Sequence, residues 1–198
     1  MPRGNIDKNL VIAETAALAN EIGFSNVSLK LLAERLNIRT PSLYNHITSL
    51  EELKQELMAY GWGELCGKLA EVLIGESGDD AIRLGCNTFY EYAITNPGVF
   101  EAMAFSSRND RRMNTDASHE FMRMLFKVLE KRNIGEENAL HVMRLARSYI
   151  EGFALFVING AFDTTQETLK ESFDFGVEVI IDCIHKLEAG EPQRVEPF

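Results

Sequence analysis

Five polar side chains able to form hydrogen bonds gather within one short stretch of this sequence. They are Thr40, Ser42, Tyr44, Asn45 and His46. These groups are short or planar, so each can meet a base edge or a phosphate with little loss of side-chain entropy. A helix that only fills space more often carries Lys and Glu on its outer face. The cluster therefore favours binding to double-stranded DNA over a plain helical hairpin, which stays open as the alternative.

Simpler roles also stay open for three residues of this stretch. Tyr44 could cover the core of a small helical domain, and His46 could be a surface histidine with its own partner. Arg39 lies in the preceding turn and could be a solvated charge. The sequence alone does not decide between these roles and contact with DNA.

A helix-turn-helix would place the cluster on a surface. Residues 28–47, SLKLLAERLNIRTPSLYNHI, indicate two short helices joined by a tight turn. Ser28 suits the N-cap of the first helix, and Asn37 tolerates the left-handed conformation of the turn. Thr40 and Pro41 suit the start of the second helix, expected over about 40–47. Such a pair places its second helix in a major groove.

The rest of the chain also has helical periodicity, and no segment has the alternation of a strand. A first helix should end at Gly23, a natural C-terminal cap. Overlapping capping boxes at Thr48–Glu51 and Ser49–Glu52 predict a fourth helix that runs to about Ile74. Five further helices are expected at 79–95, 97–105, 115–133, 136–160 and 167–188. The predicted fold class is therefore all-α, with about nine helices.

Two domains are expected on either side of the polar break Gly75–Gly78. Residues 4–63 would form the DNA-binding domain, and residues 75–190 a larger domain for effector binding and dimerisation. We expect a loop at 106–114 and disorder in the tail 191–198.

The N-terminal third resembles the DNA-binding domain of the TetR family of transcription regulators. The resemblance covers about residues 5–60 and is carried by Gly23-Phe24, a Ser-Leu and a Leu-Ala pair, Ser-Leu-Tyr-x-His, and Ser-x-Glu-Glu-Leu in this order. It implies a homodimeric regulator, by family default a repressor, that is released from a palindromic operator by a small molecule. The matching positions imply DNA contacts from Ser28, Lys30, Arg39, Thr40, Ser42, Tyr44, Asn45, His46 and Lys54.

Asn37 replaces the family's usual Gly in the turn, and Glu14-Thr15 replaces its usual Ala-Ala, but two other departures bear more on binding. Leu50 stands where the family usually has a phosphate-binding Lys, and Lys54, one turn later, is the expected substitute. The C-terminal half resembles one subclass of TetR C-terminal domains, which has a Leu-His-Gly-Phe element. This chain has Ile150-Glu151-Gly152-Phe153, so a carboxylate replaces the histidine.

Two long C-terminal helices are more apolar than a monomer needs, which favours a dimer interface. Two protomers would also set the recognition helices roughly 34–36 Å apart, as successive major grooves require. The predicted interface residues are Phe153, Val157, Ala161, Phe173, Val177, Ile180, Ile181 and Ile184.

A pocket for an unknown small apolar effector is predicted inside the C-terminal domain, because Met and aromatic side chains commonly line pockets in helical bundles. The predicted lining is Phe89, Tyr92, Met103, Phe105, Met122, Phe126, Met143, Tyr149 and Phe153. The alternative is that these residues are ordinary core. Arg144 and Arg147 could meet a charged effector, or could be solvated or paired.

The net charge of −10 does not by itself favour DNA binding, but residues 1–54 carry six basic and six acidic residues and are balanced. Three widely spaced cysteines suit a reducing cytoplasm. No catalytic, metal or cofactor motif is apparent, nor a membrane span or signal peptide. Two rivals remain: a DNA-binding regulator without a small-molecule effector, and a helical ligand-binding protein or enzyme that keeps the hairpin as scaffold.

Overall fold

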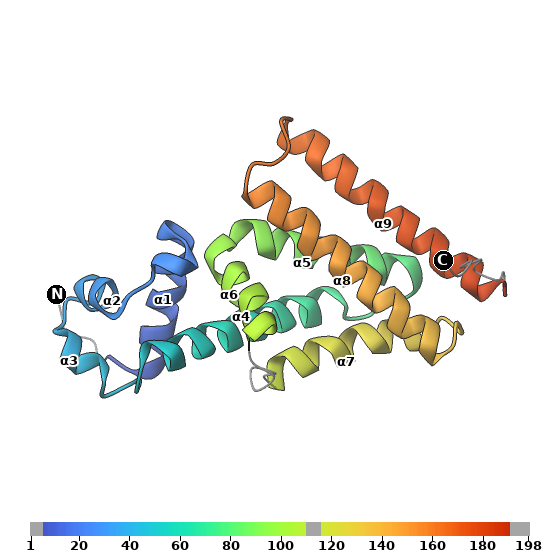
Figure 1. Cartoon of the computed structure of the whole chain (residues 1–198). Helices are drawn as coiled ribbons and strands as arrows, with labels where there is room; N and C mark the ends of the chain where they lie inside the picture. The colour runs from blue at the N-terminus through green and yellow to red at the C-terminus, as the bar shows by residue number, and fades with distance from the viewer. Residues whose placement is uncertain (1–5, 110–115, 191–198) are drawn as a thin grey trace. The chain divides into compact units, whose positions relative to one another are not determined.

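The computed structural model describes residues 6–109 and 116–190; at 105–109 and 116–117 it describes the backbone only. Within these ranges the chain forms nine α-helices and one short 3-10 turn, and no strand. Figure 1 shows the helices, which are α1 (Lys8–Ile22), η1 (Phe24–Asn26), α2 (Leu29–Arg35), α3 (Thr40–Leu43), α4 (Leu50–Val72), α5 (Gly78–Thr95), α6 (Pro97–Asn109), α7 (Asp116–Glu130), α8 (Glu136–Ile158) and α9 (Gln166–Glu188). The all-α prediction is confirmed.

Most predicted helix ends agree with the structure because capping residues encode them. Gly23 follows α1 with a positive φ of 85°, and its N–H donates to the carbonyl of Ala19. One of the two largest differences concerns α6, which continues to Asn109 where a loop was expected from residue 106. The remainder of that expected loop, 110–114, and the tail 191–198 lie outside the described residues.

Two compact units divide the chain, and they do not follow the predicted boundaries. One falls within Met1–Glu64 and Thr95–His119, and the other within Leu65–Ile94 and Glu120–Phe198. The first unit therefore contains α6, which the sequence had suggested would belong with the C-terminal helices. The long helix α4 contributes to both units.

The N-terminal turn of α6 is joined to the end of α1. The Asn20 side-chain carbonyl accepts hydrogen bonds from the backbone N–H groups of Gly98 (3.0 Å) and Val99 (3.1 Å). In return, the carboxylate of Glu101 accepts one from the N–H of Phe24 (3.0 Å). A Cβ on Gly98 would lie 2.0 Å from the backbone oxygen of Ala19, so only glycine permits this approach. We call these contacts the α1–α6 clamp.

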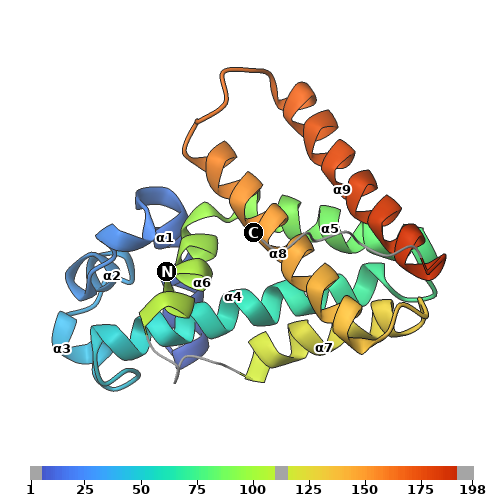
Figure 2. The ribbon, with the colours of Figure 1, turned by 45° about the vertical axis from the view of Figure 1, so that its right-hand side comes forward.

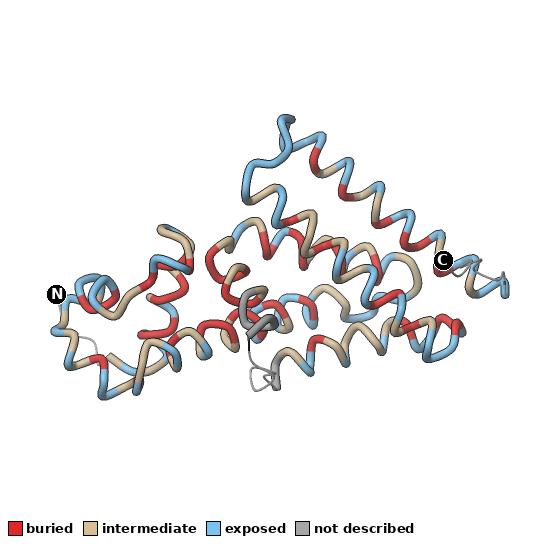
Figure 3. Tube along the Cα trace, in the orientation of Figure 1, coloured by how far each residue is buried: buried red, intermediate tan, exposed pale blue. Residues whose placement is uncertain are grey.

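In the second unit, α8 and α9 form an antiparallel pair (Figure 2). Buried and exposed residues alternate along both helices (Figure 3), as expected when one face packs inward. The ring of Phe173 stacks on that of Tyr90, with 4.1 Å between centroids. Tyr149 donates a hydrogen bond to the carbonyl of Phe173 (3.0 Å), and its ring leaves no space for a Cβ at Gly176.

A polar cluster in the second unit joins the start of α5, the turn after α7 and the end of α9. Arg132, only 9% exposed, contacts Asp79 at the start of α5 (2.6 Å) and Glu188 at the end of α9 (2.7 Å). The imidazole of His185 also lies 3.0 Å from Asp79. The hydrogen bond from Arg132, and then that from His185, hold the pKa of Asp79 below its ordinary value.

We expect Asn20→Ala to lower the free energy of unfolding by about 1–2 kcal/mol, because two helix N–H groups lose their cap. Urea unfolding followed by circular dichroism measures this. Asn9→Ala, an exposed site on the same helix, is the matched control and should change stability by less than about 0.5 kcal/mol. Equal losses in the two variants would contradict the role given to the clamp.

We expect the stability that Asp79 contributes to depend on pH. A depressed carboxylate pKa means that the contribution is complete at neutral pH and is lost as the pH falls through the lowered pKa. Asp79→Asn should therefore lower the unfolding free energy by about 1–2 kcal/mol at pH 7, and by less at pH 3. Asp182→Asn, exposed on α9, serves as control. A loss for Asp79→Asn that is the same at both pH values would contradict this assignment.

Candidate nucleic-acid interface and internal cavity

The first helix of the hairpin has the predicted cap. Ser28 precedes α2, and its hydroxyl accepts a hydrogen bond from the N–H of Leu31 (3.3 Å). After α2, Asn37 has a φ of 54°, as the tight turn was expected to require. The N–H of Ile38 reaches back to the carbonyl of Ala33 (3.0 Å), so the turn closes as a Schellman motif.

The second helix is shorter than predicted. α3 comprises only Thr40–Leu43, whereas the sequence suggested about 40–47. Beyond it, Asn45 and His46 donate their N–H groups to the carbonyls of Ser42 and Leu43, three residues earlier. These 3-10-type hydrogen bonds extend the helical segment by one turn beyond α3. Leu43 and Ile47 are buried on the inner side of this segment.

The polar side chains of residues 39–46 lie at or near the surface. Tyr44 is 54% exposed, which disfavours the alternative that it covers the core. Asn45 and Arg39 are exposed, whereas Thr40, Ser42 and His46 are half-buried. The predicted cluster therefore shares one short segment, and most of it is accessible to a partner.

The predicted basic contacts are placed less uniformly. Lys30 is exposed, 4.0 Å from Glu34. The amine of Lys54 lies over the ring of Phe24, 5.2 Å from its centroid, so the expected substitute for a phosphate-binding Lys has a cation–π contact. Leu50 opens α4 and is half-buried.

Side-chain contacts join the hairpin to α1 and cap the helix that follows it. Arg35 at the end of α2 contacts Glu14 and Glu21 of α1, both at 2.7 Å. Of the two predicted capping boxes of α4, the structure shows one half of the Ser49–Glu52 box, in which Ser49 accepts from the N–H of Glu52, while the Glu52 carboxylate accepts from Thr48. The hydrogen bonds from Thr48 lower the pKa of Glu52. Sequence reasoning missed the role of Arg35, since it depends on residues far away in the chain.

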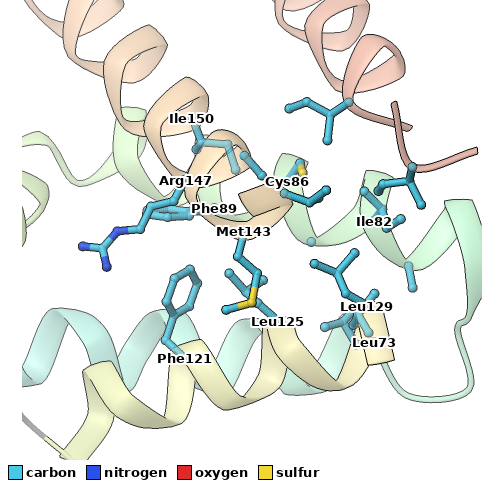
Figure 4. A pocket seen from close by; sticks show the side chains of 17 residues that line it. Leu73, Ile82, Cys86, Phe89, Phe121, Leu125, Leu129, Met143, Arg147 and Ile150 are labelled. Atoms are coloured by element: carbon cyan, nitrogen blue, oxygen red, sulfur yellow. The ribbon is translucent and has the colours of Figure 1, made fainter. Parts of the chain in front are cut away.

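The second unit contains an apolar cavity of about 50 Å³ that is partly open to solvent (Figure 4). Its lining is Leu73, Ala81, Ile82, Gly85, Cys86, Phe89, Phe121, Leu125, Val128, Leu129, Val142, Met143, Ala146, Arg147, Ile150, Ile180 and Ile184. Small residues on α5 and α8 create the space: Ala81, Gly85 and Ala146. Burial raises the pKa of the Cys86 thiol to about 12, so this thiol is neutral at pH 7.

Only two residues of the predicted pocket line this cavity, Phe89 and Met143. Tyr92 is buried elsewhere, Phe126 is half-buried, and Tyr149 and Phe153 belong to the aromatic cluster around Phe173. The other three are placed as follows: Met103 packs against Gly61 in the first unit, Met122 lies beside Arg147, and the side chain of Phe105 lies outside the described residues. Bulky apolar side chains occur in a packed core as often as around a cavity, so they do not predict a cavity. The small residues Ala81, Gly85 and Ala146 are the better indication of where the cavity lies.

Arg147 is the one charged residue among those that line the cavity. Its Nε donates to the carboxylate of Glu151 (2.6 Å), and both side chains are half-buried. Glu151, which stands where the family subclass has a histidine, thus forms an ion pair with Arg147. Arg144, three residues earlier, is exposed and does not line it.

A surface groove of about 480 Å³ adjoins the cavity and shares three wall residues with it, Leu73, Ala81 and Val128. Among the described ranges, no three His, Cys, Asp or Glu side chains gather closely enough to hold a metal ion. None of the helices described combines the length and apolar character needed to cross a membrane.

The predicted dimer residues mostly face the interior of the protomer. Five on α9 are buried: Phe173, Val177, Ile180, Ile181 and Ile184. Phe153 and Val157 are half-buried, and Ala161 is exposed. The apolar residues that remain outward are different ones, and we call them the outer strip: Leu155, Phe156, Phe162, Phe175 and Val179. Apolar periodicity indicated the helices but could not separate their two apolar faces.

Comparison with known proteins identifies the family. A family model described as Tetracyclin repressor-like, C-terminal domain, matches residues 82–180, half of the chain. The chain is 30% identical over 181 residues to the HTH-type transcriptional regulator YobS of Bacillus subtilis (strain 168), covering 91% of this chain and 93% of that one. It is 23% identical over 190 residues to the HTH-type regulator Rv0681 of Mycobacterium tuberculosis, covering 96% and 83%.

Solved structures share the fold. A TetR-type regulator from Streptomyces coelicolor superposes with a TM-score of 0.75 at 14% identity, over 93% of this chain and 100% of that one. A TetR variant from Acinetobacter baumannii AYE, in complex with minocycline, gives 0.73 at 20% identity, over 93% and 99%. The chain belongs to the TetR family of helix-turn-helix transcriptional regulators, as the sequence resemblance predicted.

Proposed function

We propose that this regulator is a homodimeric repressor that binds a palindromic operator in the cytoplasm and is released by a small apolar ligand, without any catalytic activity of its own. The observation that carries the DNA-binding part is the exposed polar surface of the α2–α3 hairpin, above all Tyr44. Leu43 and Ile47 are buried and pack the segment against the core, so Tyr44 and Asn45 project from a well-packed backbone.

The outer strip supports a homodimer. Phe175 is 73% exposed and Val179 is 50% exposed on α9, while Phe156 is 54% exposed on α8. Several large apolar side chains outward on one helix pair commonly mark a protein interface. A two-fold interface would present two recognition helices to successive major grooves, and the operator would share that symmetry.

The cavity supports a small apolar effector, since its lining is almost entirely hydrocarbon, thiol and thioether. Ligand binding would favour a state with lower affinity for the operator. The effector can shift that equilibrium only by its differential affinity for the two states.

One observation favours the second candidate, a regulator that answers to no small molecule. The cavity volume is about 50 Å³, whereas an engineered cavity that binds benzene has roughly 150 Å³. An effector must therefore enlarge this cavity. If no ligand enlarges it, this regulator would be controlled by other means. Operator binding is common to both candidates.

We expect the combined change Thr40→Ala and Tyr44→Ala to abolish specific operator binding while leaving stability within about 1 kcal/mol, because both side chains reach the surface. Mobility shift over a salt series, on the intergenic DNA beside the gene, measures the binding. Asn9→Ala is the control and should bind normally. Wild-type affinity in the double variant would contradict the assigned interface.

We expect Phe175→Glu to convert the dimer to monomers, since a carboxylate would be buried without a partner in the interface. Sedimentation equilibrium measures the change, and operator affinity should fall with it. Leu84→Glu is matched in character, because Leu84 is an exposed apolar residue on α5, outside the outer strip. Dissociation by both variants, or by neither, would show that the outer strip is not the interface.

A further inference from the structure

A single layer of apolar side chains lies between the cavity and the surface groove. The groove runs over the end of α4, the turn that follows it, the start of α5 and the C-terminal half of α7. Leu73, Ala81 and Val128 border both spaces. The groove, at about 480 Å³, is much larger than the cavity, at about 50 Å³. A molecule that could fill the cavity therefore has ample room in the groove, one side-chain layer away.

The three side chains of this layer differ in size and in conformational freedom. Ala81 is buried on α5 and has only a methyl group. Val128 lies within α7, where a β-branched side chain holds essentially one rotamer. Leu73 lies just beyond the end of α4 and is half-buried beside the exposed Ile74. Leu73 can therefore change rotamer most readily, whereas Ala81 and Val128 set the width of the gap that this rotation opens.

The other end of the cavity is closed by a charged side chain. Figure 4 shows Arg147 on the opposite side of the labelled lining from Leu73. The guanidinium of Arg147 forms an ion pair with Glu151, with 2.6 Å between Nε and the carboxylate. Entry at this end would require a paired charge to move. Entry from the groove requires only hydrocarbon side chains to move, and exposed side chains change rotamer within nanoseconds.

We infer that the surface groove is the entrance to the cavity, that rotation of Leu73 opens it, and that Ala81 determines how wide an apolar ligand can pass. Ala81 is thus a specificity-determining residue, which admits narrow apolar groups and excludes broad ones. Its role toward an effector rests on the proposed function, but passage of a small molecule can be measured without one.

Cys86 supplies a reporter inside the cavity. Its thiol is buried, and Cys86 lines the cavity but not the groove. The probe is methyl methanethiosulfonate, a small neutral reagent. The thiolate attacks the sulfenyl sulfur of the reagent, a disulfide forms, methanesulfinate leaves, and the thiol proton passes to solvent. Peptide mapping by mass spectrometry, in mildly alkaline buffer, follows Cys86 separately from the half-buried Cys66 and Cys183.

Ala81→Val should slow modification of Cys86 by about tenfold, because two added carbon atoms narrow the gap through which the reagent passes. Ala146→Val is the matched control. Ala146 lines the cavity but not the groove, and it lies next to Arg147 on α8. This control adds the same two carbon atoms at the other end and should leave the rate close to that of the wild-type protein.

A second pair of variants changes the rate in the opposite direction. Val128→Ala widens the gap and should speed modification of Cys86 severalfold. Its control is Val142→Ala, which enlarges the cavity at a residue that does not border the groove and should have the smaller effect. This pair tests the entrance even if Ala81→Val does not fold, and thermal unfolding establishes that each variant is folded.

The outcomes separate this inference from the proposed function. Equal effects within each pair, a larger effect of Ala146→Val, or no reaction of Cys86 in the folded protein overturns the entrance. A modification rate that rises with urea as steeply as global unfolding does also overturns it, because access would then require unfolding. A ligand that releases the operator would still support the proposed function after any of these results. The expected rates without any releasing ligand support the entrance and contradict release.

Discussion

The placement of the α2–α3 hairpin depends on one set of hydrogen bonds, the α1–α6 clamp. The first N–H groups of any helix lack partners within that helix, and α6 obtains two of them from Asn20 of α1. Glu101 returns a hydrogen bond to Phe24 just beyond the end of α1. Since Arg35 joins α2 to α1, the hairpin, α1 and α6 form one continuous set of contacts. The hairpin is thus positioned by a segment that follows it by some 50 residues in the chain.

This arrangement determines how a change elsewhere could reach the hairpin. The two compact units are connected covalently at three places: within α4 at residues 64–65, at the end of α5 at residues 94–95, and within α7 at residues 119–120. The sequence suggested only the first connection, because α6 was assigned to the C-terminal domain. Coupling between a ligand in the second unit and the hairpin would require a two-state element that both sites bias.

The sequence predicted what adjacent residues encode and failed where distant contacts decide. Gly23, Asn37 and Pro41 set helix ends within a few residues of themselves, so these ends could be read directly. Periodicity likewise identified α9 as apolar, but Phe173 and Phe175 differ completely in burial although they are two positions apart. Tyr90 and Tyr149, which lie far away in the chain, determine which face of α9 packs inside the protomer and which face is exposed. Most of the cavity's lining escaped prediction for the same reason, because a void is a property of packing among α5, α7, α8, α9 and the turn that follows α4.

The size of the cavity also limits how a ligand could act. An unfilled apolar space of about 50 Å³ costs about 1 kcal/mol at the usual rate per unit volume. Filling it without any other change would therefore supply only about a fivefold shift in an equilibrium, near the lower end of measured allosteric couplings. A repressor that leaves its operator decisively needs more differential affinity than this. Any further differential affinity must come from contacts that the ligand makes in only one of the two states.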